Sequence, residues 1–430
     1  MSISPFYKTA EELAGYGFQN IPKEYQTNTH LIYSSPATLA FNSPGAEGFG
    51  VKRAGLSIPD SVMLLVSPGC CGRNTTGLGN VEEYQGRVFY LEMEENDLVT
   101  GKHLKKIPQA VKEIIEVCKK RPSVVMICIT CVDALLGTDM ERVCHKAEET
   151  AGIPVRPCYM YALTREGRKP PMVHVRQSLY SLLSPMKKRG TSVNILGYFA
   201  PLLSECELYD LLRSVGVKNI RELGTCKDYE EYKKMAEANF NLVLNAEARF
   251  AALDIEKRLQ IPFIELKRLY QIDKIASQYA ALGAAIGVNF EDGDYRNAAE
   301  QAVERVKEEY PEAAFAVGEF MNGDPFELSL ALVKYGFTVT SVYGTPNAEN
   351  FSFIEALAKV SPKTKIYSNL EPSMTFYQPE DPIDFVIGKD AAYYHPKVPA
   401  VLWQSDIQPF GYAGVRALFE QLLAVGKEER

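Results

Sequence analysis

The sequence lacks the features of a membrane protein, a secreted protein and a nucleic-acid-binding protein. No stretch approaches the run of about 18 apolar residues that a membrane-spanning helix needs. The first residues, MSISPFYKTAEELAGYGF, contain neither the basic nor the apolar segment of a signal peptide. Lys and Arg number 47 against 54 Asp and Glu, which gives a net charge of −7 without a basic stripe for a phosphate backbone. We therefore expect a cytoplasmic protein with no membrane and no nucleic-acid partner.

Several common catalytic motifs are absent as well. The sequence has no GxxxxGK[ST] and hence no P-loop for ATP, and it has no GxSxG or HExxH of an esterase or zinc protease. The nine cysteines are an odd number at irregular spacing, which disfavours a disulfide framework. In a reducing compartment such cysteines stay free or bind metal.

What the chain does contain, from residue 60 onward, is an alternation of short apolar runs with amphipathic stretches. This alternation predicts the α/β class with parallel sheets. Residues 1–58, rich in Ser, Pro, Gly and Tyr, are expected to be irregular. Two polar linkers, at 184–192 and 289–297, predict three α/β domains. These are 1–189 (an N-terminal extension plus a cluster-binding α/β domain), 190–300 and 301–430. The strands are expected at 61–67, 87–92, 123–129, 153–157, 192–198, 218–222, 240–245, 313–318, 336–342, 383–387 and 398–402.

Two groups of cysteines stand at the ends of strand-like runs. Cys70 and Cys71 follow SVMLLVSPG, and Cys128 and Cys131 close SVVMICITC. Ligands of parallel sheets collect outside the carboxyl ends of the strands, and thiolates are soft ligands suited to iron–sulfur clusters. The pattern therefore predicts an iron–sulfur cluster and electron transfer. Cys128 lies inside its strand, so that a buried structural thiol is an equal alternative, and Cys70 is either a further ligand or a spare.

Longer segments occur in a set order: LEMEENDLVTGKHLKKIPQAV, ITCVDALLGTDMERVC, NILGYFAPLLSECELYDLL, NFNLVLNAEARFAALDIEKRL and WQSDIQPFGYAGVRALFEQLL. Together they resemble the component 1 superfamily of nitrogenases. That group contains catalytic dinitrogenase subunits, cofactor-assembly scaffold proteins and protochlorophyllide-reductase-like subunits. The resemblance implies three Rossmann-like domains with metal sites between domains and between subunits.

The resemblance also assigns roles to single residues. Cys71 and Cys131 match cysteines that are cluster ligands in the family. His174 falls near a family histidine that lines the catalytic cavity, and the alternative is an ordinary surface histidine. Arg249 stands one helical turn after Asn245 and could face an anionic substrate, with a surface ion pair as the alternative.

Three departures from the family pattern are informative. The upstream region FNSPGAEGFGVKRAG has no third cluster cysteine. Asn245 stands where the family places the cysteine that anchors its large catalytic cofactor, and Phe410 stands where it places the completing histidine. An amide and a phenyl ring cannot replace a thiolate and an imidazole as iron ligands. We therefore expect no FeMo-type cofactor and no reduction of N2.

These observations lead to a nitrogenase-like oxidoreductase subunit with a [4Fe-4S] or P-cluster-like cluster. Two chains giving Cys71 and Cys131 would complete the cluster in a homodimer. Alternatively, this chain gives Cys71, Cys128 and Cys131 in a heterodimer or heterotetramer with a second component 1-like subunit. The resemblance implies that ATP binds only to a partner, a nitrogenase iron-protein-like ATPase reductase. The substrate would be a small molecule with a C=C or C=N bond, and His174 a proton donor. The alternatives are a non-catalytic scaffold for metal-cofactor assembly and a member without cluster function.

Overall fold

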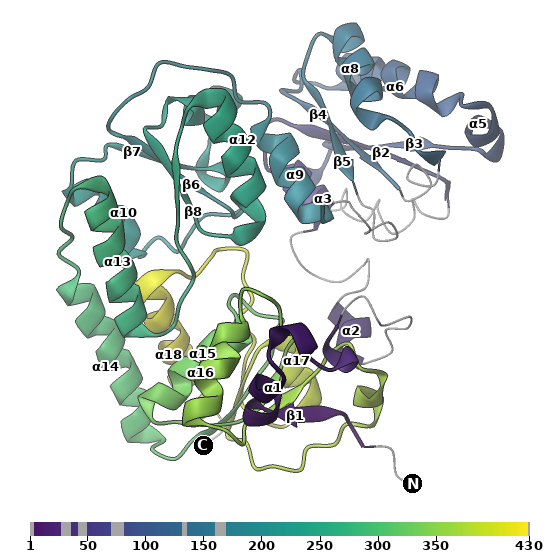
Figure 1. Ribbon diagram of the computed structural model, residues 1–430. Helices are drawn as coiled ribbons and strands as arrows, with labels where there is room; N and C mark the ends of the chain where they lie inside the picture. Colours follow the sequence, from purple (N-terminus) through teal and green to yellow (C-terminus); the bar gives the residue numbers. More distant parts are fainter. Residues whose placement is uncertain are drawn as a thin grey trace. The chain divides into compact units, whose positions relative to one another are not determined.

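The computed structural model describes residues 4–26, 36–41, 50–69, 81–130, 136–159 and 169–428 (Figure 1). Its described residues form three sheets with helices between the strands, which confirms the predicted α/β class. The chain divides into two compact units: 48–201 with 216–267, and 1–47 with 202–215 and 268–430. The first unit holds two four-stranded sheets and the second holds a six-stranded sheet. The division into three domains stays a prediction.

The first sheet of the 48–267 unit is fully parallel, with the order β3-β2-β4-β5. The chain starts in the middle of this sheet, moves outward to β3 and returns to β4, so that the direction of winding changes between β2 and β4. Such a switch point is where open α/β sheets bind ligands. The strands are β2 (Val62–Ser67), β3 (Val88–Glu92), β4 (Val125–Ile129) and β5 (Val155–Tyr159).

Helices cover both faces of this sheet (Figure 1). In β4, Val125, Ile127 and Ile129 face α6 and α8, while Met126 and Cys128 face α3 and α9. This division follows from the period of two in strand side chains. A strand buried on both faces needs a continuous apolar run, and the residues of β4 are all apolar. The helices are α3 (Val51–Gly55), α5 (Glu95–Thr100), α6 (His103–Val117), α8 (Met140–Ala151) and α9 (Pro171–Tyr180).

The second sheet of this unit repeats the same winding, with the order β7-β6-β8-β9 and all strands parallel. Its switch point lies between β6 and β8. Helix α12 packs with α9 over a core that the two sheets share. The elements are β6 (Ser192–Leu196), β7 (Asn219–Glu222), α11 (Tyr229–Lys233), β8 (Phe240–Val243), α12 (Arg249–Leu259) and β9 (Phe263–Glu265).

The six-stranded sheet of the second unit has the order β1-β12-β11-β10-β13-β14. Its five later strands are parallel, and their winding reverses between β10 and β13. The strands are β1 (Tyr7–Thr9), β10 (Ala314–Val317), β11 (Thr338–Tyr343), β12 (Lys365–Tyr367), β13 (Phe385–Ile387) and β14 (Ala400–Val401). The helices are α1 (Ala10–Tyr16), α2 (Pro36–Phe41), α10 (Glu207–Ser214), α13 (Ile272–Ile286), α14 (Gly293–Glu309), α15 (Pro325–Tyr335), α16 (Phe351–Val360), α17 (Lys389–Tyr394) and α18 (Gly411–Glu428).

The expectation that residues 1–58 are irregular was wrong for part of this segment. Strand β1 pairs antiparallel with β12, so that Tyr7 lies opposite Tyr367. Helix α1 then begins at a capping box in which Thr9 and Glu12 satisfy each other's backbone N–H groups. The strand pairing joins residues far apart in the sequence, which a local pattern cannot reveal. The capping box was readable in the sequence as TAEE.

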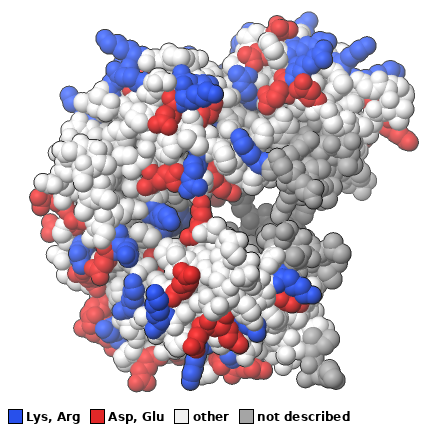
Figure 2. Space-filling model, in the orientation of Figure 1, with Lys and Arg blue, Asp and Glu red and all other residues white. Residues whose placement is uncertain are grey.

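The described surface carries both charge signs. Figure 2 shows Lys and Arg side chains interspersed with Asp and Glu over the face that it draws, without a broad area of one sign among the described residues. Such a face offers no basic track for nucleic acid. No helix within the described ranges is long and apolar enough to cross a bilayer.

Candidate functional site

The two cysteine groups follow strands that are direct neighbours. Strands β2 and β4 pair in parallel, with Val66 opposite Ile129, so that their carboxyl ends lie at the same edge of the first sheet. Gly69 and Thr130 are the last described residues before the cysteines. The predicted ligands Cys70, Cys71 and Cys131 lie outside the described residues.

The described part of this sheet edge holds a hydroxyl, a glycine and one carboxylate. The Thr130 hydroxyl is buried and has no hydrogen-bond partner among the residues that the structure describes. Ser67, at the end of β2, accepts a hydrogen bond at its backbone oxygen from the Tyr90 hydroxyl at 3.0 Å. A side chain on Gly69 would meet the carboxylate of Glu92, which would have to turn away to make room for it. A buried orphan hydroxyl beside small residues suits a ligand that accepts a hydrogen bond, such as a cluster sulfide or thiolate.

Cys128 is a buried thiol in an apolar environment. Its side chain is 1% exposed and packs with Met126 and Cys158 on the α3 and α9 side of the sheet. Burial raises the pKa of the Cys128 thiol to about 12, although the nearby Lys52 opposes this rise. A thiol with that pKa stays protonated at neutral pH, whereas metal ligation requires the thiolate. This environment favours the alternative of a structural thiol. No group of three or more His, Cys, Asp and Glu side chains in the described ranges is arranged to hold a metal ion.

His174 lies in the first half of α9, against the carboxyl end of β5. Its ring meets the Tyr159 ring edge-on, with the centroids 4.4 Å apart. Its Nδ1 atom is buried and has no hydrogen-bond partner within the described part of the chain, and burial lowers the pKa of His174, so that the imidazole is neutral at physiological pH. A neutral imidazole has one N–H to donate and one nitrogen to accept with. His174 is thus placed at a sheet edge with hydrogen-bonding capacity to spare.

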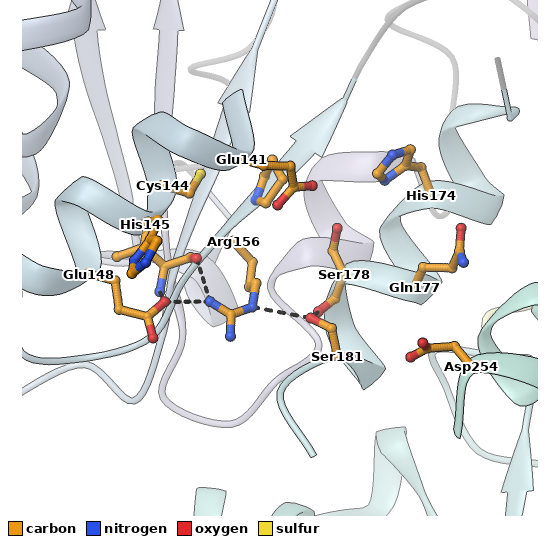
Figure 3. A pocket seen from close by; sticks show the side chains of 12 residues that line it. Glu141, Cys144, His145, Glu148, Arg156, His174, Gln177, Ser178, Ser181 and Asp254 are labelled. Atoms are coloured by element: carbon orange, nitrogen blue, oxygen red, sulfur yellow. Dashed lines mark hydrogen bonds and ion pairs between the residues drawn. The ribbon is translucent and has the colours of Figure 1, made fainter. Parts of the chain in front are cut away.

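His174 also lines a cavity of about 570 Å³ between α8, the edge strand β5 and α9. No sequence pattern indicated this cavity. Figure 3 shows Arg156 held between Glu148 and Ser181, with Glu141 between this group and His174. Burial raises the pKa of Glu141, and Arg156 opposes that rise. The cavity is therefore polar, but its one arginine is already paired.

Arg176, which no sequence pattern indicated, connects α9 to the neighbouring sheet. Arg176 is 4% exposed and donates from Nε to the backbone oxygen of Gly197, 2.8 Å away, at the end of β6. Its Nη1 atom pairs with the Glu247 carboxylate at 2.7 Å, and its guanidinium lies 4.4 Å from the centre of the Phe199 ring. This buried arginine fixes the helix that carries His174 against the carboxyl end of the second sheet.

That second sheet edge contains two of the residues singled out in the sequence. Asn245, shortly after β8, accepts a hydrogen bond at Oδ1 from the backbone N–H of Glu247 at 2.9 Å and so caps the following turn. Arg249 forms a two-pronged ion pair with Glu265, with Nε–Oε1 at 2.7 Å and Nη2–Oε2 at 2.8 Å. The structure therefore places Arg249 in the surface ion pair that was its alternative. Its role toward a substrate stays a prediction.

Phe410, in the second unit, is 1% exposed and precedes helix α18. Its backbone oxygen lies 3.7 Å from the Cys206 Sγ atom, which donates a weak hydrogen bond to it. The positions of the two family anchors are thus filled by a capping amide and a packed ring. The Asn245 amide oxygen is engaged with the Glu247 N–H and a phenyl ring has no donor atom for iron, and the expected absence of a FeMo-type cofactor stays a prediction.

Comparison with known proteins identifies relatives over nearly the whole chain. A family model described as nitrogenase component 1 type oxidoreductase matches residues 47–425. Curated relatives include the nitrogenase iron-molybdenum cofactor biosynthesis protein NifE of Nostoc sp., 25% identical over 238 residues, which are 54% of this chain and 49% of that protein. The protein of the same name from Klebsiella pneumoniae is 25% identical over 286 residues, 61% of each chain. The chain thus spans about half the length of the curated relatives that it matches.

Solved structures give the same result at the level of the fold. A structure titled "Nitrogenase Cp1 at pH 6.5" superposes with a TM-score of 0.67 at 19% identity, over 89% of this chain and 92% of the other. A second, titled "Nitrogenase Cp1 at pH 5", gives a TM-score of 0.63 at 16% identity, over 98% of each chain. At such identities the likeness concerns the fold alone.

Proposed function

Because the chain belongs to the nitrogenase component 1 type oxidoreductase family, we propose that it is an oxidoreductase subunit that carries an iron–sulfur cluster. Electrons would come from an iron-protein-like ATPase reductase, which alone would bind ATP. They would pass through the cluster to a small-molecule substrate other than N2. The subunit would act as a homodimer or beside a second component 1-like subunit.

The observation that carries this proposal is the pairing of β2 with β4. The strands before the two cysteine groups are hydrogen-bonded neighbours and flank the switch point of their sheet. That point is the ordinary ligand site of such sheets. Cys71 and Cys131 would be the cluster ligands. Cys70 stays a further candidate, and the burial of Cys128 makes it the weakest of the four.

Two further observations bear on the substrate. Asn245 and Phe410 lack the donor atoms for a FeMo-type cofactor, and such a cofactor is therefore not part of the proposal. The buried Nδ1 atom of His174, beside the end of β5, has no partner among the described residues, which suits a residue that exchanges a proton with a substrate. The cluster would supply single electrons, and the side chains of this chain would orient the substrate and supply protons.

The test is iron and acid-labile sulfide analysis of protein purified without oxygen, with EPR after reduction by dithionite. Cys71→Ala and Cys131→Ala should each lose the iron and the EPR signal, because each removes a thiolate ligand. Cys118→Ala is the matched control: Cys118 is half-buried in the same unit, and its removal should leave the iron content unchanged.

The iron stoichiometry then separates the assemblies. About four irons per two chains would support a cluster bridging a homodimer, while about four per chain would require more ligands from one chain. Cys128→Ala should keep its iron if the buried thiol is structural, and should lose it if Cys128 is a ligand. Well-folded protein without iron would refute the electron-transfer proposal.

A second candidate function is a scaffold on which a metal cofactor is assembled. It is favoured by the curated relatives, which are named as cofactor biosynthesis proteins at about a quarter identity. A scaffold should transfer a bound metal cluster to a cluster-free acceptor protein and should reduce no substrate with an iron protein and ATP. An oxidoreductase subunit should keep its cluster in the transfer assay and turn over with the reductase.

A further inference from the structure

The six-stranded sheet of the second unit has its own switch point, between β10 and β13, and none of the proposed ligands belongs to this sheet. Each of these two strands is followed by a glycine, Gly318 after β10 and Gly388 after β13. A Cβ on Gly388 would approach the Gly318 Cα to 3.1 Å, and Gly388 has φ +104°, which favours glycine. The two turns therefore touch through their backbones. In Rossmann-like sheets this turn after the central strand presents backbone N–H groups to the phosphate of a nucleotide.

In this chain a carboxylate already occupies that turn. Asp390 is fully buried in the first turn of α17. It accepts hydrogen bonds from the backbone N–H groups of Glu319 at 3.0 Å and Phe320 at 3.2 Å, and from Asn369 Nδ2 at 2.7 Å. A side chain on Gly318 would overlap the Asp390 carboxylate. The donors that would bind an external anion thus surround an internal one.

A second carboxyl group lies beside it. Glu319 accepts from the backbone N–H of Thr345 at 2.9 Å and from Asn369 Nδ2 at 3.1 Å, so that both acids share one amide nitrogen. Asp390, from α17, is the charged group acting on Glu319, while Thr345 after β11 and Asn369 after β12 are neutral donors. Burial and the Asp390 charge raise the pKa of Glu319 to about 7. Burial also raises the pKa of Asp390, but its three N–H donors oppose that rise and favour its ionised form.

We propose that the turn after β10 is an anion-binding site whose anion is the chain's own Asp390 carboxylate, and that Glu319 carries the proton of this carboxyl pair. Two adjacent carboxyl groups do not both ionise readily, so the better-hydrogen-bonded one keeps the charge. The six-stranded sheet has the topology of a nucleotide-binding sheet, but the Asp390 carboxylate occupies the position at which such a sheet would bind a phosphate. This inference is independent of the proposed electron transfer, because it concerns only residues of the second unit.

The first test is an asymmetry between two isosteric variants. Glu319→Gln replaces a protonated carboxyl by a neutral amide and loses one of its two acceptors, so it should lower the urea midpoint at pH 6 less than Asp390→Asn does. Asp390→Asn replaces the charged acceptor by an amide whose NH2 faces N–H donors, and it should lower the midpoint clearly. Trp403, the one tryptophan of the chain, lies in the same unit and reports its unfolding by fluorescence. The opposite order of the two variants would place the proton on Asp390 and overturn the assignment.

The second test is chemical rescue. Asp390→Ala should leave an empty anion site lined by the same N–H groups, and formate, a carboxylate of matching size, should raise its urea midpoint more than chloride at equal ionic strength. Wild-type protein and Asp390→Asn should respond equally to the two salts. If formate and chloride act alike on Asp390→Ala, or if this variant is as stable as the wild type, the turn is not an anion site.

Discussion

Replacing Glu207 by alanine should destabilise the start of helix α18, the helix that opens with the family-like GYAG segment. Glu207 is fully buried at the first position of α10. Its carboxylate accepts from the backbone N–H groups of Tyr412 at 2.6 Å and Ala413 at 3.0 Å, and from the Tyr279 hydroxyl at 2.6 Å. The carboxylate thus caps the N-terminus of α18 from a different helix, where a negative charge is favoured.

The magnitude follows from the three donors. A buried donor left without a partner costs about 1–3 kcal/mol, so that Glu207→Ala should lose about 4 kcal/mol once the Tyr279 hydroxyl has turned to another partner. Glu207→Gln keeps one acceptor oxygen but turns an NH2 group toward a donor, and it should lose about 2 kcal/mol. Both losses are large compared with the usual stability of a domain, about 5–15 kcal/mol.

Two measurements check that Glu207→Ala loses more stability than Glu207→Gln. Urea unfolding followed by Trp403 fluorescence reports the unit that contains Glu207, and hydrogen exchange read on residues 411–428 by mass spectrometry reports the helix start itself. Glu205→Ala is the control, because Glu205 is exposed two residues away, its carboxylate accepts a hydrogen bond from the adjacent Ser204, and it touches α18 through the distant charge of Arg416 and not through the capped backbone N–H groups. If hydrogen exchange in α18 is the same in Glu207→Ala as in the wild type, Glu207 does not cap this helix.

Other predictions concern buried side chains elsewhere. His395 is 3% exposed, its Nε2 atom lies 2.7 Å from the Tyr343 hydroxyl, and burial lowers its pKa to about 4. Because the unfolded chain binds the proton more tightly, stability should fall as pH drops from about 6.5 to 4, by up to about 3 kcal/mol. The difference between wild type and His395→Gln in urea midpoint should follow that window, and a pH-independent difference would contradict it. Arg176→Lys cannot keep both the Gly197 bond and the stacking on Phe199, so it should cost about 2 kcal/mol and speed hydrogen exchange in residues 192–201. Equal exchange in wild type and variant would show that the arginine does not hold this edge.

The alternation of apolar and amphipathic runs was enough to predict the class, the parallel sheets and most central strands. Central parallel strands such as β2 and β4 are apolar throughout, and this composition is local. Short strands carry a weaker signal: β9, at the edge of its sheet, and β12, between β1 and β11, have three residues each and were missed. The cysteine groups were recognised because they directly follow the strongest strand signals, although three of these cysteines lie outside the described residues.

What the sequence alone determined is therefore local: strand and helix periods, the order of the elements, and the residue types that stand at positions such as 245 and 410. The tertiary structure decided which groups become partners. It paired Arg249 with Glu265 and turned Asp390 into the anion of the turn after β10. The physical reason is that periodicity is set by backbone geometry within a few residues, whereas the charge state and partner of a side chain depend on burial. Burial brings together segments that are far apart along the chain, and no local pattern specifies their meeting.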